Sequence, residues 1–166
     1  MLVIGIDPGT ATTGFGVVRE NKDGDLIAVD YGIIQTPTNL DMPERLLELH
    51  KKLTVILLLH HPESGAVEKL FFERNIRTAL SVGQGRGVCM LALAQAGIKM
   101  AEYTPLEVKQ AISGYGRADK NQISQMVQAI LGLPNQPYPD DASDALAIAI
   151  CHIHSAKFNT LVEGSA

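Results

Sequence analysis

The first 35 residues contain three strand-like segments that are separated only by short turns. Residues 2–7 are apolar and β-branched and end at a Pro-Gly pair, residues 14–19 form a second segment, and residues 26–35 follow the turn sequence KDGD. Parallel neighbours need a crossover of a dozen or more residues, and these connections are too short to supply one. The segments therefore predict an antiparallel meander and exclude an all-parallel sheet.

Farther along the chain, helices and strands alternate. Helical periodicity covers residues 41–59, 75–96, 104–112, 119–131 and 140–156, and short strand-like runs cover 64–70 and 98–103. This order predicts an α/β fold with a five-stranded mixed sheet, three strands antiparallel and then parallel ones, and helices on both faces. We expect a single domain over residues 1–157 and a frayed C-terminal tail over 158–166.

Composition excludes several classes of protein. Hydrophobic residues make up 46% and charged residues 19% of the chain, which excludes intrinsic disorder. The two cysteines, Cys89 and Cys151, have no metal-like spacing, so we expect free thiols and a cytoplasmic location. No stretch has the roughly 20 apolar residues of a membrane helix. The five histidines form no ligand pattern, and we expect structural roles for them.

The charge is unevenly distributed along the chain. The net charge is −4, which by itself argues mildly against a nucleic-acid partner. Residues 68–120, however, have more basic than acidic side chains, whereas the segments on either side are acidic. The basic middle predicts either an ordinary mixed surface or a local anion-binding face.

Carboxylates occupy positions that the fold alone does not require. Asp7 ends an apolar strand, Glu68 lies late in another, and Asp141 and Asp144 are three residues apart on one face of the last helix. Each has a structural explanation: Asp7 as a turn cap, Glu68 as a surface acid, and the helix acids, with Asp140, as partners of the helix dipole. Together they also form a set of hard oxygen ligands suited to Mg²⁺.

Three motifs resemble one known family. The segments IGIDPGTATTGFGVV, AVEKLFFERNIRTALSVGQGRGV and PDDASDALAIAICH are similar, in this order, to motifs of the RuvC family of crossover-junction endonucleases. The resemblance covers nearly the whole chain and implies an RNase H-like fold and a homodimer. It also implies that the catalytic and metal-binding acids are Asp7, Glu68, Asp141 and Asp144. Asp140 is an extra acid that helical spacing alone does not exclude.

The same resemblance implies an activity and partners. It implies a structure-selective DNA endonuclease that resolves four-way (Holliday) junctions by paired symmetric nicks, in recombination and repair. Two Mg²⁺ ions per active site, which Mn²⁺ can replace, would support hydrolysis to a 5′-phosphate and a 3′-hydroxyl. The implied partners are four-way junction DNA and, by family resemblance, the branch-migration proteins RuvA and RuvB.

Several residues are predicted to contact DNA. Lys109 and Lys120 match phosphate-contacting positions of the family, and Phe71 matches an aromatic position at the junction centre. Among the other basic residues of the middle segment, we expect contacts from Arg74, Arg77 and Arg117. Phe71 has core packing as its structural alternative.

The long helix over 75–96 contains Gly83, Gly85 and Gly87, each of which costs about 1 kcal/mol relative to alanine. Small residues allow close helix approach, either to a second copy or to this chain's own sheet or helices.

Other functions are compatible with parts of the pattern. The first motif also resembles the phosphate loop of actin-like ATPases, which need two such domains. Another RNase H-like nuclease and a non-catalytic junction-binding module are the remaining alternatives. Cleavage in the presence of metal distinguishes the enzyme from the binding module.

Overall fold

The computed structural model describes residues 1–69 and 76–163. Its one sheet has the strand order β3-β2-β1-β4-β5. The strands are β1 (Leu2–Asp7), β2 (Thr12–Glu20), β3 (Leu26–Gln35), β4 (Ser64–Glu68) and β5 (Lys99–Tyr103). β1, β2 and β3 pair antiparallel, and β4 pairs parallel with both β1 and β5. The predicted mixed five-stranded sheet is therefore confirmed.

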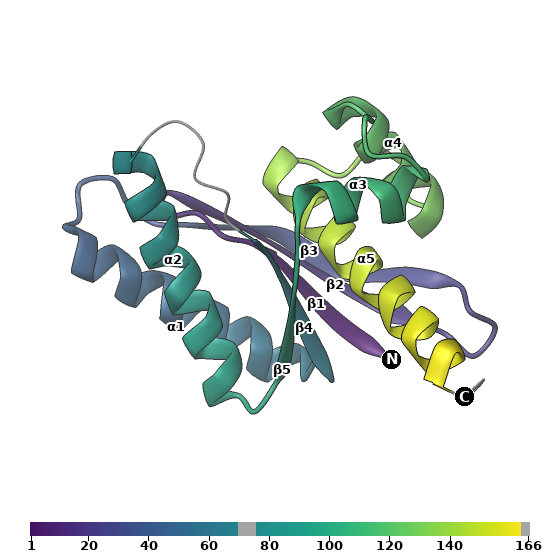
Figure 1. Cartoon of the computed structure of the whole chain (residues 1–166). Coiled ribbons are helices and arrows are strands. Elements are labelled where there is room, and N and C mark those ends of the chain that lie inside the picture. The colour runs from purple at the N-terminus through teal and green to yellow at the C-terminus, as the bar shows by residue number, and fades with distance from the viewer. Residues whose placement is uncertain (70–75, 164–166) are drawn as a thin grey trace.

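Helices cover both faces of this sheet, as predicted. Figure 1 shows α1 (Met42–His60) and α2 (Ile76–Gln95) on one face, and α3 (Pro105–Ser113), α4 (Lys120–Leu131) and α5 (Asp140–Glu163) on the other. α3 and α4 each begin with a complete capping box, at Thr104 and Asp119. None of the described helices is long and apolar enough to cross a membrane.

Three elements differ from their predicted bounds by two residues or more. β2 is longer than residues 14–19, because it continues its pairing with β3 from Thr12 to Glu20. β4 ends at Glu68 rather than at residue 70, since its ladder with β5 ends where Glu68 pairs with Tyr103. α5 continues to Glu163, beyond the predicted end near residue 156, and this stretch contains no glycine or proline to stop it.

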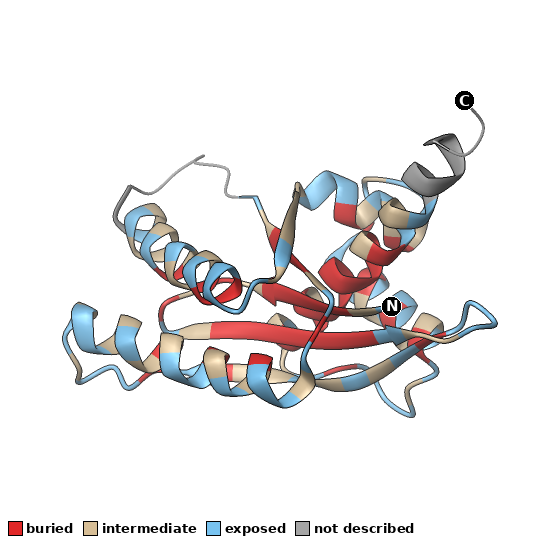
Figure 2. Cartoon of the chain, turned by 90° about the horizontal axis from the view of Figure 1, so that it is seen from below, coloured by how far each residue is buried: buried red, intermediate tan, exposed pale blue. Residues whose placement is uncertain are grey.

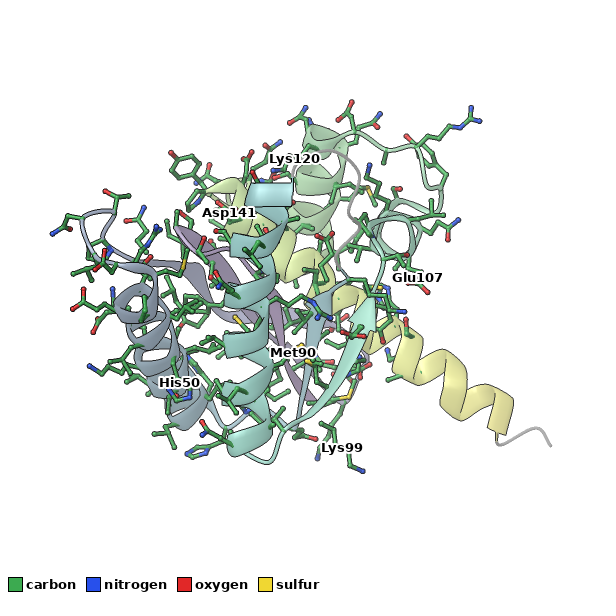
Figure 3. The ribbon with its side chains drawn as sticks, turned by 60° about the vertical axis from the view of Figure 1, so that its left-hand side comes forward. His50, Met90, Lys99, Glu107, Lys120 and Asp141 are labelled. Atoms are coloured by element: carbon green, nitrogen blue, oxygen red, sulfur yellow. The ribbon has the colours of Figure 1, made fainter. Side chains whose placement is uncertain are left out.

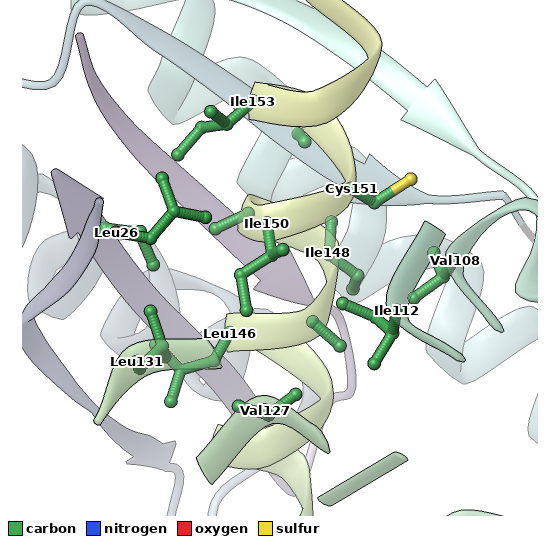
Figure 4. Close-up of a cluster of buried hydrophobic side chains, with 14 of the residues drawn as sticks. Leu26, Val108, Ile112, Val127, Leu131, Leu146, Ile148, Ile150, Cys151 and Ile153 are labelled. Carbon is green, nitrogen blue, oxygen red and sulfur yellow. The ribbon is translucent and has the colours of Figure 1, made fainter. Parts of the chain in front are cut away.

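The sheet separates two hydrophobic clusters. On the α1/α2 side, Ile4, Ile6 and Val67 pack against leucines of both helices. On the other side, α5 lies along β1 and β2 with α3 and α4 outside it, and Figure 4 shows its Leu146, Ile148 and Ile150 between Leu26 and Ile112. Figure 2 shows the buried central strands between helices whose outer faces are exposed. The core is therefore apolar on both faces of the central strands, and the strand ends hold the polar groups.

A polar contact on the α5 side joins this helix to the sheet. His152 of α5 is hydrogen-bonded through its Nδ1 to the Tyr103 hydroxyl at 2.9 Å and through its Nε2 to Ser64 Oγ at 3.0 Å. Burial lowers the pKa of this imidazole, which favours the neutral ring that can both donate and accept. Cys89 and Cys151 are buried free thiols on opposite faces of the sheet.

Candidate active site

The carboxyl ends of β1 and β4 bring Asp7 and Glu68 side by side. The two strands run parallel, with Ile6 opposite Val67. The next residue of β1, Asp7, therefore lies beside the next residue of β4, Glu68. Side chains alternate between the faces of a strand, and Ile6 and Val67 face α1 and α2. Asp7 and Glu68 therefore both face α5.

Helix α5 brings the remaining acids to the same edge because glycines let it approach the sheet. A Cβ on Gly14, the cross-strand partner of Asp7, would lie 1.9 Å from the carbonyl oxygen of Asp141. A Cβ on Gly5 would lie 2.1 Å from the carbonyl oxygen of Ala145, one turn farther along the helix. The N-terminal end of α5, which carries Asp141 and Asp144, is thus seated directly beside the end of β1.

The four acids lie within electrostatic reach of one another. Burial raises the pKa of the Asp7 carboxyl to about 7, and three neighbouring carboxylates act in the same direction: Asp144, Glu68 and Asp141. Burial, followed by the charge of Asp144, also raises the pKa of Glu68. Burial raises the pKa of Asp144 as well, against the opposing effect of Lys120. Asp7, Glu68, Asp141 and Asp144 therefore form one acidic cluster.

Lys120 is the cation of this cluster. Its Nζ lies 3.1 Å from Asp144 Oδ2 and 3.4 Å from Asp140 Oδ2. Figure 3 shows Lys120 and Asp141 at the same end of the molecule, with Lys99 at the opposite end. Asp140 is exposed and pairs with Lys120 at the rim, whereas the charge of Asp141 acts on the half-buried Asp7.

The donor set fits a hard divalent cation. The cluster offers carboxylate oxygens, which Mg²⁺ and Mn²⁺ prefer, and the four acids carry more negative charge than Lys120 can balance. Within residues 1–69 and 76–163, no three His, Cys, Asp or Glu side chains are yet grouped closely enough to hold an ion. A divalent cation bound between these acids would offset the repulsion of their like charges.

Basic residues border the cluster on the α3/α4 side. The positive charge of Lys109 acts against the raised pKa of Glu68, so Lys109 lies close enough to interact with that acid. Lys109 and Lys120 line a hollow of about 270 Å³ together with Glu68 and Asp144. Arg117 is exposed just before α4. These three predicted DNA contacts therefore lie on or near the face that carries the acids.

The other predicted DNA contacts cannot be placed. Phe71 and Arg74 lie outside the described residues, as does the side chain of Arg77. Their roles remain predictions from the resemblance.

Helix α2 contacts the main chain near the ends of β1 and β4 from the opposite face of the sheet, and sequence reasoning did not single out Arg86, which makes one of these contacts. Arg86 donates from its Nε to the main-chain oxygen of Glu68 at 3.2 Å and forms an ion pair with Glu102 of β5. On the same helix, Ser81 is hydrogen-bonded to Thr10 at 2.5 Å. An arginine inside an otherwise apolar and small-residue helix is the signal that could have identified Arg86.

The glycines of α2 divide between the two predicted uses. A Cβ on Gly85 would lie 2.9 Å from the carbonyl oxygen of Gly9, so this glycine permits a crossing within the chain. Among the residues that the structure describes, none has an atom within 4 Å of a Cβ built on Gly87, which is on the exposed side of the helix. Packing within the described part of the chain therefore explains the glycine at position 85, but it does not explain the glycine at position 87.

Comparisons with known proteins all point to one family. The family model "Crossover junction endodeoxyribonuclease RuvC" matches residues 3–152. A relative of the same name from Syntrophomonas wolfei is 52% identical over 166 residues, which cover 100% of this chain and 96% of the relative. The RuvC structure from Thermus thermophilus superposes with a TM-score of 0.89 at 36% identity, covering 96% of this chain and 98% of that one.

A second Thermus thermophilus structure, of RuvC in complex with a Holliday junction substrate, has a TM-score of 0.88 at 34% identity and covers the same share of both chains, 96% and 98%. These neighbours confirm the expected RNase H-like fold. From the family model and the full-length relatives, this chain belongs to the RuvC family of crossover junction endodeoxyribonucleases, which are metal-dependent nucleases.

Proposed function

We propose that this protein resolves four-way (Holliday) DNA junctions by paired symmetric nicks, in recombination and repair. The observation that carries the proposal is the convergence of Asp7, Glu68, Asp141 and Asp144 at one edge of the sheet, beside Lys120. The Thermus thermophilus relative that is similar over 96% of this chain was solved with a Holliday junction substrate, which supports the choice of DNA substrate. Family membership favours this function over an ATPase or a non-catalytic module.

The four acids would hold Mg²⁺, two ions per site, and Mn²⁺ would substitute because it accepts the same oxygen ligands. When bound, such ions neutralise charge on the scissile phosphate and supply hydroxide at neutral pH. Asp7 is central to the cluster, since its pKa responds to the other three acids. In hydrolysis a water oxygen bonds to phosphorus and the P–O3′ bond breaks, leaving a 5′-phosphate and a 3′-hydroxyl.

Lys109 and Lys120 would hold the phosphates that flank the cleaved bond. Both line the hollow that opens on Glu68 and Asp144, so a backbone bound there passes directly over the acids. Phosphate contacts position a strand without reading its sequence. Arg117 extends this surface at its exposed end, and Phe71, Arg74 and Arg77 are assigned to it by resemblance alone.

A homodimer would present two equal sites to two opposed strands. The exposed side of α2 supports such an assembly. Leu80 and Leu91 are 64% and 53% exposed, and Gly87 lies between them on the same side of the helix. Two apolar side chains around a glycine allow close approach by a second copy of the helix.

Two further parts of the proposal concern the cellular setting. A cytoplasmic location would keep the buried thiols Cys89 and Cys151 reduced. RuvA and RuvB are proposed as branch-migration partners by family resemblance.

The test uses a labelled, immobile four-way junction and a matched linear duplex, each incubated in EDTA, Mg²⁺ or Mn²⁺. We expect junction-selective binding in EDTA and paired, symmetric nicks that DNA ligase can seal once metal is added. Asp7→Asn should abolish the nicks and retain junction binding, while Asp23→Asn, in the exposed turn before β3, is the matched control. Binding without nicks in both metals, or equal cleavage of the linear duplex, would contradict the proposal.

A further inference from the structure

A second, polar hollow adjoins the acids on the side of α4. It has a volume of about 380 Å³, within the range of ordinary small-ligand pockets, and it shares Lys120, Asp140 and Asp144 with the active site. Its remaining wall comes from the first turns of α4 and α5 and the segment before α5: Asn121, Ser124, Gln136, Pro137, Tyr138 and Ser143. None of these residues belongs to the acidic cluster, so the hollow extends the site away from the metal ligands.

The charge of this hollow does not suit a further phosphate. Lys120 is the one cation that lines it among the described residues, and two acids, Asp140 and Asp144, line it as well. The rest of the wall is neutral and consists of amide, hydroxyl and aromatic groups. Such a lining suits an uncharged heterocycle that carries both donors and acceptors.

Two exposed amides of the wall lie next to each other. Gln136 Nε2 lies 3.5 Å from Asn121 Oδ1, a long contact that leaves each amide with unused hydrogen-bonding capacity. A side-chain amide offers a donor and an acceptor together, which is the pair that binds an adenine edge through two hydrogen bonds.

Ser143 provides an independent sign that something binds here. Its residue is only 3% exposed and lines the hollow, yet its hydroxyl has no hydrogen-bond partner among the described residues. A buried hydroxyl without a partner is unfavourable, and a polar ligand group in the hollow would satisfy it.

Tyr138 stands at the rim with 84% of its surface exposed. An exposed aromatic ring beside a polar hollow is suited to stack on a base, as aromatic rings do in proteins that bind single strands. The ring of Tyr138 would add stacking to the hydrogen bonds that the amides and the Ser143 hydroxyl can make with a ligand.

We propose that this hollow is a nucleobase subsite, which takes a base of the cleaved strand adjoining the scissile phosphodiester. Asn121 and Gln136 read the edge of the base, Ser143 completes its hydrogen bonds, and Tyr138 stacks on it. The proposal rests on the proposed junction cleavage and adds a source of sequence preference to it, because the phosphate contacts of Lys109 and Lys120 carry none.

The test is cleavage of four-way junctions whose bases around the cut are randomised, with each product sequenced. The unaltered protein should prefer particular bases beside the cut. Asn121→Ala and Gln136→Ala should each reduce the ratio between best and worst sequences by about five-fold or more. Tyr138→Ala should slow cleavage roughly five-fold or more at all sequences, since stacking is tolerant of sequence.

Gln125→Ala is the matched control, because Gln125 is an exposed amide on α4 that does not line the hollow. Melting temperature and junction binding in EDTA show that each variant is folded. Ser143→Ala tests the buried hydroxyl separately. This variant should reduce the preference for particular bases beside the cut without lowering the melting temperature.

The outcomes separate the two proposals. Cleavage by the unaltered protein without base preference, or an unchanged preference in Asn121→Ala and Gln136→Ala, would overturn the subsite and leave junction cleavage standing. A uniform loss of rate in both amide variants would overturn it as well. Absence of any cleavage by the unaltered protein would contradict the proposed function itself.

Discussion

Gly14 lies directly beneath the main chain of Asp141, so that a Cβ at this position would come within 1.9 Å of the Asp141 carbonyl oxygen. Gly14 is also the cross-strand partner of Asp7. One missing side chain therefore sets the separation between the strand that carries Asp7 and the helix that carries Asp141 and Asp144. The geometry of the acidic cluster depends on this contact.

We expect Gly14→Ala to displace the start of α5 and to reduce both stability and cleavage. Overpacking of a tight contact typically costs 1–3 kcal/mol, so the free energy of unfolding should fall by about 2 kcal/mol. Chemical denaturation measures the first effect and junction cleavage the second. If the variant had the stability and the cleavage rate of the unaltered protein, the position of α5 would not depend on its close contact with Gly14.

The raised pKa of Asp7 predicts a pH-dependent stability in the metal-free protein. The folded-state pKa of about 7 lies above the ordinary value of 3.8, so the folded protein binds more protons than the unfolded chain between these values. Stability should therefore fall as pH rises through this window, by on the order of 2 kcal/mol.

Asp7→Asn removes this titration, so in EDTA the variant should be more stable than the unaltered protein near pH 8 and should differ little near pH 4. Chemical denaturation in EDTA across this range measures the difference. A difference that does not change with pH would contradict the burial of a charged Asp7.

Arg86 and Glu102 form a half-buried pair, with 17% and 34% of their side chains exposed. Removing Arg86 leaves Glu102 without its partner and frees the Glu68 carbonyl, so Arg86→Gln should lower the free energy of unfolding by about 2 kcal/mol. The double variant Arg86→Gln/Glu102→Gln should lose less than the sum of the single variants. Strict additivity in denaturation would exclude an energetic link between the two residues.

Lys120→Ala should weaken junction binding in EDTA and make it less sensitive to salt, because a lysine that contacts a phosphate displaces a counterion. The slope of log K against log salt should become shallower by about one unit. Lys22→Ala, in the exposed turn after β2, should leave both quantities unchanged. Equal effects of the two variants would remove Lys120 from the DNA-binding face.

The exposed stripe on α2 predicts an oligomeric state that depends on Leu80 and Leu91. A glutamate at either position would bring like charges together at the interface, so Leu80→Glu and Leu91→Glu should each convert the dimer to a monomer in sedimentation analysis. Val55→Glu on α1 is the control, since Val55 is also 64% exposed but lies on another helix. Persistence of the dimer in both α2 variants would locate the interface elsewhere.

The sequence by itself determined the order and type of the elements and the identity of the acids. Turn residues and hydrophobic periodicity act within a few residues of the chain, so the antiparallel start and the later alternation of helices and strands could be predicted from short stretches of sequence. Motif resemblance named Asp7, Glu68, Asp141 and Asp144 before any geometry was known.

Only the tertiary structure decided how these residues meet. Asp7 lies beside Glu68 because of the pairing register of β1 and β4, two strands about sixty residues apart in the sequence. The close approach of α5 to Gly14 depends on how the two hydrophobic clusters pack against the sheet. The hollow that brings Asn121 and Gln136 toward the unpartnered Ser143 is built from α4, α5 and the segment between them. Such contacts are set by the mutual fit of surfaces across the whole core, which no short window of sequence contains.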